Sequence, residues 1–331
     1  MIVFALLQST KEEGIFSSMQ AIVIDPQAPA RLGFQTVEAP QPLANEALVS
    51  VKAISLNRGE VVYRVQGAAG TPLGWDLAGV VEQAAADGSG PPQGTRVVGV
   101  DMETPSAWAE LVAVPTNALA ELPPSVSFAQ AAALPVAGLT ALHALEHGGN
   151  LLARSVLVTA ASGGVGLFAC RLAQLSGARV VGQVRHPASA SLVQEAGADH
   201  VVVDENITVA AAFGPYHLII DQLGGRMLAE AMTQLAPGGT CVSVGALAGS
   251  DVPLDWARVR QVPGANLDFF NLWFELRREP ASFGLTRLVH LVSTGKLTPF
   301  PGMEADWHEI GRVAQALIDR QFLGKAVLHI S

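Results

Sequence analysis

An alternation of short apolar runs with amphipathic runs between residues 155 and 244 constrains the fold of this chain more than any other feature. Parallel strands that follow one another in sequence need crossover connections, and these are helices that cover both faces of the sheet. The pattern therefore predicts a doubly wound domain that is complete by about residue 262. Its expected strands are Ser155–Thr159, Arg179–Val184, His200–Val203, His217–Asp221 and Thr240–Val244.

A glycine-rich turn, Ala160-Ala161-Ser162-Gly163-Gly164-Val165-Gly166, lies between the first strand and the helix that follows it. This is the context that a dinucleotide fingerprint requires. Gly163 lets the backbone approach a pyrophosphate, Gly166 lets the helix pack closely on the strand, and the helix N-terminus offers free N–H groups. Ala161 departs from the usual first glycine. We expect Ser162 to Gly166 to bind the cofactor, with a tight turn that binds nothing as the alternative.

The same residues permit a second interpretation. Ala160-x-Ser162-x-Gly164 approximates the nucleophile elbow of a serine hydrolase, for which Asp221 and His329 are available as acid and base. The elbow's leading glycine is missing, and Gly166 has no specific purpose in it. A serine hydrolase is therefore the less favoured alternative.

The end of the second strand bears on the choice of cofactor. NAD sites carry an acidic residue ~20 positions after the glycines. Here the chain reads Gly182-Gln183-Val184-Arg185-His186, so Arg185 can pair with a phosphate and no carboxylate repels it. NADP(H) is predicted, with Arg185 as an ordinary surface charge the alternative. Because ligands lie beyond the carboxyl ends of such strands, Thr140, Leu223 and Gly245-Ala246 are expected near the nicotinamide.

Composition excludes several classes of protein. The 331 residues are about twice the usual ~150-residue domain, so two domains are expected. A net charge of -9 argues against nucleic acid and anionic membranes as partners. The two cysteines, Cys170 and Cys241, are too few for a thiolate zinc site or a disulfide framework. Both are predicted to be buried, and the cytoplasm is the default compartment.

The sequence outside this alternating region has a different pattern. From Met19 to about Pro115, β-rich runs broken by glycine and proline predict a small barrel or sandwich. Ser127-Phe128-Ala129-Gln130 has the pattern of a capping box and opens a helical stretch interrupted by Pro135. The tail, from about residue 278, is predicted to contain helices and a final strand, Ala326–Ile330, and to pack back onto the first domain.

Five segments in order resemble the medium-chain dehydrogenase/reductase superfamily, especially its zinc-free quinone oxidoreductase and enoyl reductase branch. The resemblance implies an α/β protein: residues 19–134 and 278–331 form a GroES-like β-rich catalytic domain, and residues 135–277 a doubly wound Rossmann nucleotide-binding domain. Residues 1–18 are predicted to be a flexible N-terminal extension. The five segments are Ile54-Ser55-Leu56-Asn57-Arg58-Gly59-Glu60, Gly74-Trp75-Asp76-Leu77-Ala78-Gly79, residues 133–141, Ala161 to Gly166, and Gly324-Lys325-Ala326-Val327-Leu328.

The resemblance also implies that no metal is used. Zinc-dependent alcohol dehydrogenases of the superfamily carry a ligating cysteine where this chain has Asn57, and a ligating histidine where it has Trp75. Without a Lewis acid, the expected reaction is hydride transfer from NADPH to a quinone or an α,β-unsaturated carbonyl. An NADPH-binding sensor or structural protein with little turnover is the alternative.

Candidate residues follow from the same resemblance. Asn57 and Tyr63 are the catalytic candidates, although Asn57 can equally be a turn residue and Tyr63 a packed barrel tyrosine. Trp75 and Phe270 are candidate walls of the substrate pocket, and Lys325 is assigned to the cofactor site.

A homodimer is expected by analogy. Its contacts are predicted to involve the strand Thr240–Val244 and the apolar segment Phe269–Phe274, which is unusually hydrophobic for a loop.

Overall fold

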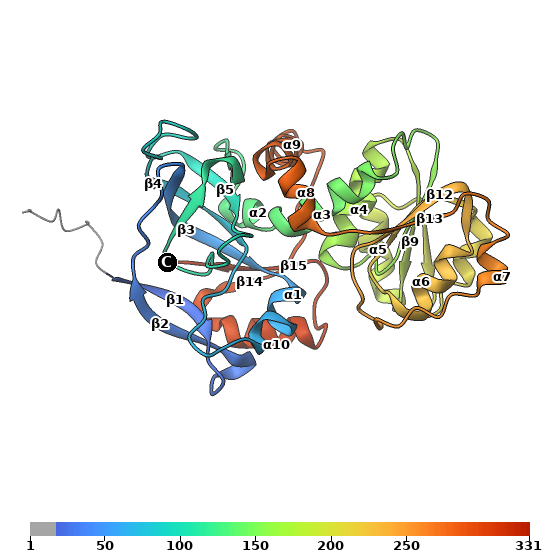
Figure 1. The fold of residues 1–331 in the computed structure, drawn as a ribbon, viewed down its shortest axis with the longest axis horizontal. Helices are drawn as coiled ribbons and strands as arrows, with labels where there is room; N and C mark the ends of the chain where they lie inside the picture. Colours follow the sequence, from blue (N-terminus) through green and yellow to red (C-terminus); the bar gives the residue numbers. More distant parts are fainter. Residues whose placement is uncertain (1–17) are drawn as a thin grey trace, which may run out of the picture.

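The computed structural model describes residues 18–331, which form two sheet-based units packed side by side (Figure 1). The predicted extension, residues 1–18, lies outside the described residues except for Ser18. The fold is α/β, with a GroES-like unit and a Rossmann-type unit. The domain boundaries themselves stay a prediction.

The Rossmann-type unit holds a six-stranded sheet in the order β10-β9-β8-β11-β12-β13, with every pair parallel. Strand order reverses between β8 and β11, which is where ligands bind in such sheets. The strands are β8 (Ser155–Val158), β9 (Arg179–Val184), β10 (His200–Val203), β11 (Tyr216–Asp221), β12 (Leu235–Ser243) and β13 (Asn266–Phe269).

This sheet confirms the doubly wound prediction and corrects its end. The unit is not complete by residue 262, because β13 pairs with β12 and forms the edge of the sheet. β12 is therefore paired on both sides, so its backbone cannot pair with a second copy, and a dimer contact that involves Thr240–Val244 stays a prediction. The helices of this part of the chain are α3 (Pro135–Glu146), α4 (Gly164–Leu175), α5 (Ala190–Glu195), α6 (Gly225–Met232), α7 (Trp256–Val259) and α8 (Leu272–Arg278).

The second unit is built on a seven-stranded sheet in the order β14-β15-β3-β4-β5-β7, with β6 also paired to β3. β1 and β2 form a separate antiparallel pair. These strands are β1 (Ser18–Ile24), β2 (Leu32–Glu38), β3 (Glu46–Leu56), β4 (Asp76–Gln83), β5 (Arg96–Val100), β6 (Leu111–Pro115), β7 (Leu119–Glu121), β14 (Pro301–Asp306) and β15 (Lys325–His329).

The tail closes this unit as the sequence predicts. β15 pairs antiparallel with β3, with Ala326 opposite Leu56. This late strand thus lies between β14 and β3, inside a sheet whose other strands come mostly from the first 121 residues. The helices on this side are α1 (Arg58–Val62), α2 (Phe128–Ala132), α9 (Ala281–Ser293) and α10 (Ile310–Ile318). The capping box of α2 is present: Gln130 N donates to Ser127 Oγ, and Ser127 N donates to the Gln130 side chain.

The two units share a core. One continuous apolar cluster includes Val98 of β5 and Val156 of β8, together with residues of α3 and α9 between them (Figure 1). Cys170 and Cys241 are fully buried, as predicted, and burial raises the pKa of both thiols, for Cys170 to about 12. Across residues 18–331, none of the helices is both long and apolar enough to span a bilayer.

Candidate active site

The glycine turn has the close packing that its sequence predicts. α4 begins at Gly164, with Gly163 as its N-cap. A Cβ at Gly166 would lie 2.6 Å from the Cα of Ala161, so only glycine allows the helix to approach the strand this closely. A Cβ at Gly163 would meet nothing nearer than 3.4 Å, so this side of the turn has room for a ligand. The first turn of α4 therefore offers backbone N–H groups suited to a pyrophosphate.

Side chains of the sheet hold the turn in place. Ala160 N donates to Gln183 Oε1 at 2.9 Å, and Gln183 Nε2 donates to the Asp204 carbonyl at 2.5 Å. Gln222 Nε2 donates to the Thr159 carbonyl at 2.5 Å and so joins the ends of β8 and β11. These bonds fix the backbone without using the free amides of α4.

The other predicted cofactor residues lie at the same edge of the sheet. Ala248 N donates to the Leu223 carbonyl at 2.7 Å, and a Cβ at Gly245 would lie 3.1 Å from the Gln222 carbonyl oxygen. The segment that contains Gly245 and Ala246 thus runs beside the end of β11. Thr140 is buried on α3, one turn beyond Val136.

The C-terminal segment of the chain joins this turn to the GroES-like unit. Gly324 N donates to the Ser162 carbonyl at 3.1 Å, and residues 163 and 324 form a parallel bridge. The stem of Lys325 packs on the turn so closely that a Cβ at Gly164 would lie 2.9 Å from Lys325 Cδ. From there the Lys325 ammonium reaches into the other unit.

The Lys325 ammonium lies in a buried polar cluster. Its Nζ donates to Asn57 Oδ1 at 2.5 Å, to the Leu56 carbonyl at 3.1 Å and to Asp76 Oδ2 at 3.1 Å. The Lys325 and Asp76 side chains are only 4% and 0% exposed. Because an ammonium has three donors and all three are used, Lys325 is not free to bind a phosphate. In this structure Lys325 therefore positions Asn57, and its place at the cofactor site stays a prediction.

Asp76 is the acceptor at the centre of the cluster. Its Oδ2 accepts from Ser55 Oγ at 2.6 Å and from Asn57 Nδ2 at 2.8 Å, as well as from Lys325. Its Oδ1 accepts from Val136 N at 2.9 Å, at the first turn of α3. Asp76 therefore ties β3, β4, β15 and the start of α3 together.

Glu60 is a second buried carboxyl, and no cation touches it among the described residues. It accepts from Asn57 N at 2.8 Å, from Asn57 Nδ2 at 3.0 Å and from Trp75 N at 2.7 Å. The pKa of Glu60 is raised to about 8, first by burial and then by the charge of Asp76, against the opposing effects of Lys325 and of the Asn57 hydrogen bonds.

Asn57 is held by both of its polar atoms. Its two amide hydrogens are used on Glu60 and Asp76, and Oδ1 accepts from Lys325. The amide therefore has no donor left for a substrate oxygen, and what it offers a ligand is the second lone pair of Oδ1. Asn57 is therefore suited to accept a hydrogen bond from a hydroxyl group, but it cannot donate one to a developing oxyanion.

The aromatic candidates divide into two groups. Tyr63 follows α1 and is 64% exposed, so the alternative of a packed barrel tyrosine is wrong. Trp75 is half-buried beside this helix, with the Arg64 guanidinium 5.8 Å from its ring centroid.

Phe270 lies elsewhere. Its ring stacks edge-on with His147, 5.9 Å between centroids, at the C-terminal end of α3. Since Asp76 binds Val136 at the other end of α3, about 16 Å away along the helix axis, the structure does not bring Phe270 to the Asn57 cluster.

Three arginines from separate segments lie close enough for their charges to interact. Arg58 Nη1 donates to the carbonyls of Leu317 and Ile318 at the end of α10, at 3.1 and 3.3 Å. Arg320 follows α10, and its pKa is lowered by burial and then by the nearby charges of Arg58 and Arg185. In a chain of net charge -9, this places positive charge beside the predicted adenosine end of the cofactor site.

The hydrolase alternative is not supported by the geometry. Asp221 accepts from Thr159 Oγ1 at 3.1 Å and from Gly224 N at 2.9 Å, and so closes its own loop. His329 is the exposed last residue of β15 in the other unit and pairs with Glu304 at 2.9 Å. Neither residue forms a triad with Ser162, so that interpretation is wrong.

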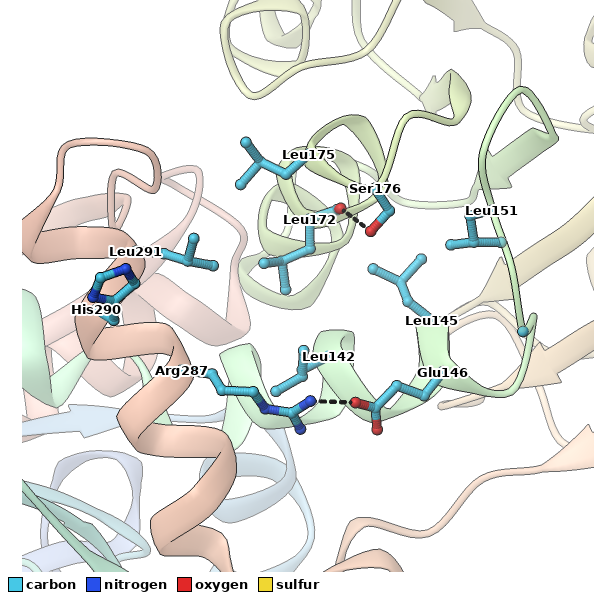
Figure 2. A pocket seen from close by; sticks show the side chains of 11 residues that line it. Leu142, Leu145, Glu146, Leu151, Leu172, Leu175, Ser176, Arg287, His290 and Leu291 are labelled. Atoms are coloured by element: carbon cyan, nitrogen blue, oxygen red, sulfur yellow. Dashed lines mark hydrogen bonds and ion pairs between the residues drawn. The ribbon is translucent and has the colours of Figure 1, made fainter.

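A separate groove of about 460 Å³ lies between α3, α4 and α9. Figure 2 shows leucines of the three helices along it and the Arg287–Glu146 pair at one side, with Nη1 and Oε1 2.7 Å apart. None of the cofactor or cluster residues described above lines this groove.

The predicted site did not include Ser55, Glu60 or Asp76. A signal for Glu60 was available, because Asn57-x-x-Glu60 has the same capping-box spacing as Ser127-x-x-Gln130, and the Glu60 carboxylate accepts from Asn57 N as such a box requires. No local pattern reports that Asp76 is buried against a lysine 249 residues away.

A Rossmann-type sheet with an open glycine turn, closed by a GroES-like unit, defines a two-domain oxidoreductase that uses a nicotinamide cofactor. Residues 164–275 match the family model described as zinc-binding dehydrogenase, a stretch that excludes Asn57 and Trp75. A quinone oxidoreductase of Pseudomonas aeruginosa is 30% identical over 232 residues, which cover 67% of this chain and 71% of that protein. A spectinabilin polyketide synthase system protein of Streptomyces orinoci is 32% identical over 300 residues; these are 88% of this chain but only 13% of that protein.

Solved structures agree. A mycobacterial quinone oxidoreductase superposes with a TM-score of 0.82 at 27% identity, covering 95% of this chain and all of that one (100%). A mycobacterial protein complexed with NADPH has a TM-score of 0.82 at 26% identity, again over 95% and 100% of the two chains. The chain belongs to the quinone oxidoreductase branch of the medium-chain dehydrogenase/reductase superfamily.

Proposed function

We propose that this protein is an NADPH-dependent, zinc-independent reductase of quinones or α,β-unsaturated carbonyls. The observation that carries the proposal is the contact between the glycine turn and the buried Asn57 cluster through Gly324 and Lys325. Through this contact the glycine turn, the proposed dinucleotide site, lies next to a preorganised polar cluster, which supports hydride transfer between them. The relatives named as quinone oxidoreductases and the NADPH-bound structural neighbour support it.

A bound nicotinamide cofactor supplies the hydride. The chain supplies the pyrophosphate site at the first turn of α4 and an acceptor for a ribose hydroxyl at Asn57 Oδ1. Trp75 offers a flat apolar surface beside Asn57, and the exposed phenol of Tyr63 is free to donate a hydrogen bond to a substrate oxygen. Since Asn57 has no free donor, Tyr63 or water is the remaining source of the product proton.

Zinc independence is supported by the donors at the site. An amide and an indole stand where the resemblance expects metal ligands, and the amide oxygen of Asn57 already accepts from a lysine ammonium. The amide oxygen that a metal would have to bind is thus already in contact with an ammonium of the chain itself.

NADPH rather than NADH is supported by Arg185 and its neighbours Arg58 and Arg320. Arg185→Ala should weaken NADPH binding about 10-fold or more, since a charge-assisted bond to the 2′-phosphate is worth ~1.5–3 kcal/mol, and should leave NADH binding nearly unchanged. Fluorescence titration with both cofactors measures this. Equal loss for the two cofactors would contradict the assignment.

The activity is tested by following NADPH absorbance with a panel of quinones and enones. Consumption with at least one class supports a reductase. Tight NADPH binding with no consumption on any acceptor would instead support the sensor alternative. Chelator-treated protein serves as the control for metal dependence.

We also propose a homodimer in the cytoplasm. The edge strand β13 ends in Phe269, which is 74% exposed, and α8 adds the exposed rings of Trp273 and Phe274. An apolar edge of this kind favours pairing with a second copy. The cytoplasmic location is supported only by composition, namely two cysteines that are both buried free thiols.

A further inference from the structure

The buried cluster contains two carboxyl groups and one ammonium. Glu60 and Asp76 are both fully buried, and Lys325 is 3% exposed. If both acids are ionised, the cluster carries a net charge of -1 in a region shielded from water. Such a charge is costly unless a further positive charge is present.

Geometry decides which acid the lysine neutralises. Lys325 Nζ donates directly to Asp76, which also accepts from Ser55, Asn57 and Val136. Glu60 receives only the neutral N–H groups of Asn57 and Trp75. Glu60 is therefore the acid that holds a proton when no other cation is near, in agreement with the raised pKa of its carboxyl.

The cluster lies where a cofactor can act on it. The Lys325 stem touches the glycine turn at Gly164, and the cluster's amide Asn57 presents a free lone pair. A nicotinamide ring is neutral when reduced and carries a positive charge when oxidised. With the nicotinamide directed toward Asn57, as the proposed function requires, hydride transfer would create beside the cluster the positive charge that compensates a second carboxylate.

We propose that the Glu60 carboxyl is a redox-linked proton site, neutral with the reduced cofactor and ionised with the oxidised one. The inference rests on the proposed function. The balance is simple: binding of the oxidised cofactor releases one proton from Glu60 to water, and the carboxylate takes one back when that cofactor leaves. Glu60 acts through Asn57 and is a positioning residue that stabilises the charge of the oxidised state.

The groups that face Glu60 are few. Asp76 comes from β4, Lys325 from β15, and Asn57 with Trp75 from the segments flanking α1 and β4. Ionisations that act on both cofactors alike, such as those of the 2′-phosphate and its arginines, cancel when the affinities for NADP+ and NADPH are compared as a ratio.

The test measures the dissociation constants of NADP+ and NADPH by fluorescence titration between pH 6 and 9. In the wild type, NADP+ should tighten about 10-fold relative to NADPH across this range, which corresponds to a one-unit difference between the pKa of Glu60 in the two complexes. Glu60→Gln should make the ratio independent of pH. Glu60→Asp, which keeps a titrating group, should restore part of the dependence, and Glu121→Gln, at an exposed position of β7, should behave as the wild type.

A second measurement needs no variant. In weakly buffered solution with a pH indicator, wild-type protein at about pH 7.5 should release more protons on binding NADP+ than on binding NADPH. Equal proton release, or a pH-independent ratio in the wild type, would overturn the inference while leaving the proposed function intact. Failure to bind either cofactor would overturn both.

Discussion

Lys325→Met removes the ammonium of the buried cluster and keeps the stem that packs on Gly164. The substitution leaves Asp76 without its cation, together with lost partners at Asn57 Oδ1 and the Leu56 carbonyl. Because the two charged side chains are 4% and 0% exposed, water cannot replace the lost interactions. Breaking one half of such a pair costs about 3–5 kcal/mol, and we expect a loss of that size in the free energy of unfolding.

Urea denaturation followed by circular dichroism measures this loss. Lys52→Met, at an exposed position of β3, is the matched control and should change stability by less than about 0.5 kcal/mol. Adding Asp76→Asn to Lys325→Met should recover part of the stability, since the unpaired charge is then gone. A loss for Lys325→Met no larger than that of the control would refute the reasoning, because the cluster would then have to be hydrated.

Three further predictions follow from the same structure. Gly166→Ala should cost about 1–3 kcal/mol and weaken cofactor binding, because the new Cβ would lie 2.6 Å from the Ala161 Cα; unchanged urea and NADPH titrations would contradict this. Glu60→Gln should gain stability relative to the wild type as the pH rises from 5 to 8. The reason is that the pKa of the wild-type carboxyl is raised from 4.5 to about 8 on folding, so the stability it contributes when protonated is lost as the pH rises toward 8. Unfolding midpoints of the two proteins that change in parallel across this pH range would contradict the prediction. Phe269→Asp should convert the proposed dimer to a monomer in light scattering, since it puts a charge on the exposed end of β13; a dimeric variant would place the interface elsewhere.

The parts of the fold predicted correctly are those written locally in the sequence. The run Arg179–Val184 is a strand because it is apolar and β-branched, and Gly166 is a close contact because the turn has no room for a side chain. β13 was not predicted because its local sequence has no strand pattern. Asn266–Phe269 is four residues long, half-exposed, and includes Asn266 and Asp268, so it carries no apolar run.

Site residues were predicted where a single local motif identifies them. They were missed where the site depends on contacts between segments far apart in the sequence. The turn Ser162–Gly166 was found from its own sequence, and Asn57 from a motif. Lys325 was assigned to the cofactor site from its place in a family-like segment, but only the pairing of β15 with β3 shows where its ammonium lies. Sequence alone does not show which end of α3 Phe270 approaches, and its role as a pocket wall stays a prediction.

The buried cluster joins the segments that surround the proposed cofactor site. In the zinc-dependent relatives that the chain resembles, a metal would tie together the segments that here carry Asn57 and Trp75. In this chain Asp76 receives Lys325 from the last strand, Ser55 and Asn57 from β3 and its end, and Val136 from α3. The same segments are thus joined by charge-assisted hydrogen bonds. In that arrangement Lys325 neutralises Asp76, and the Glu60 carboxyl has no cation of its own. We propose that a cofactor whose charge changes therefore shifts the protonation of Glu60.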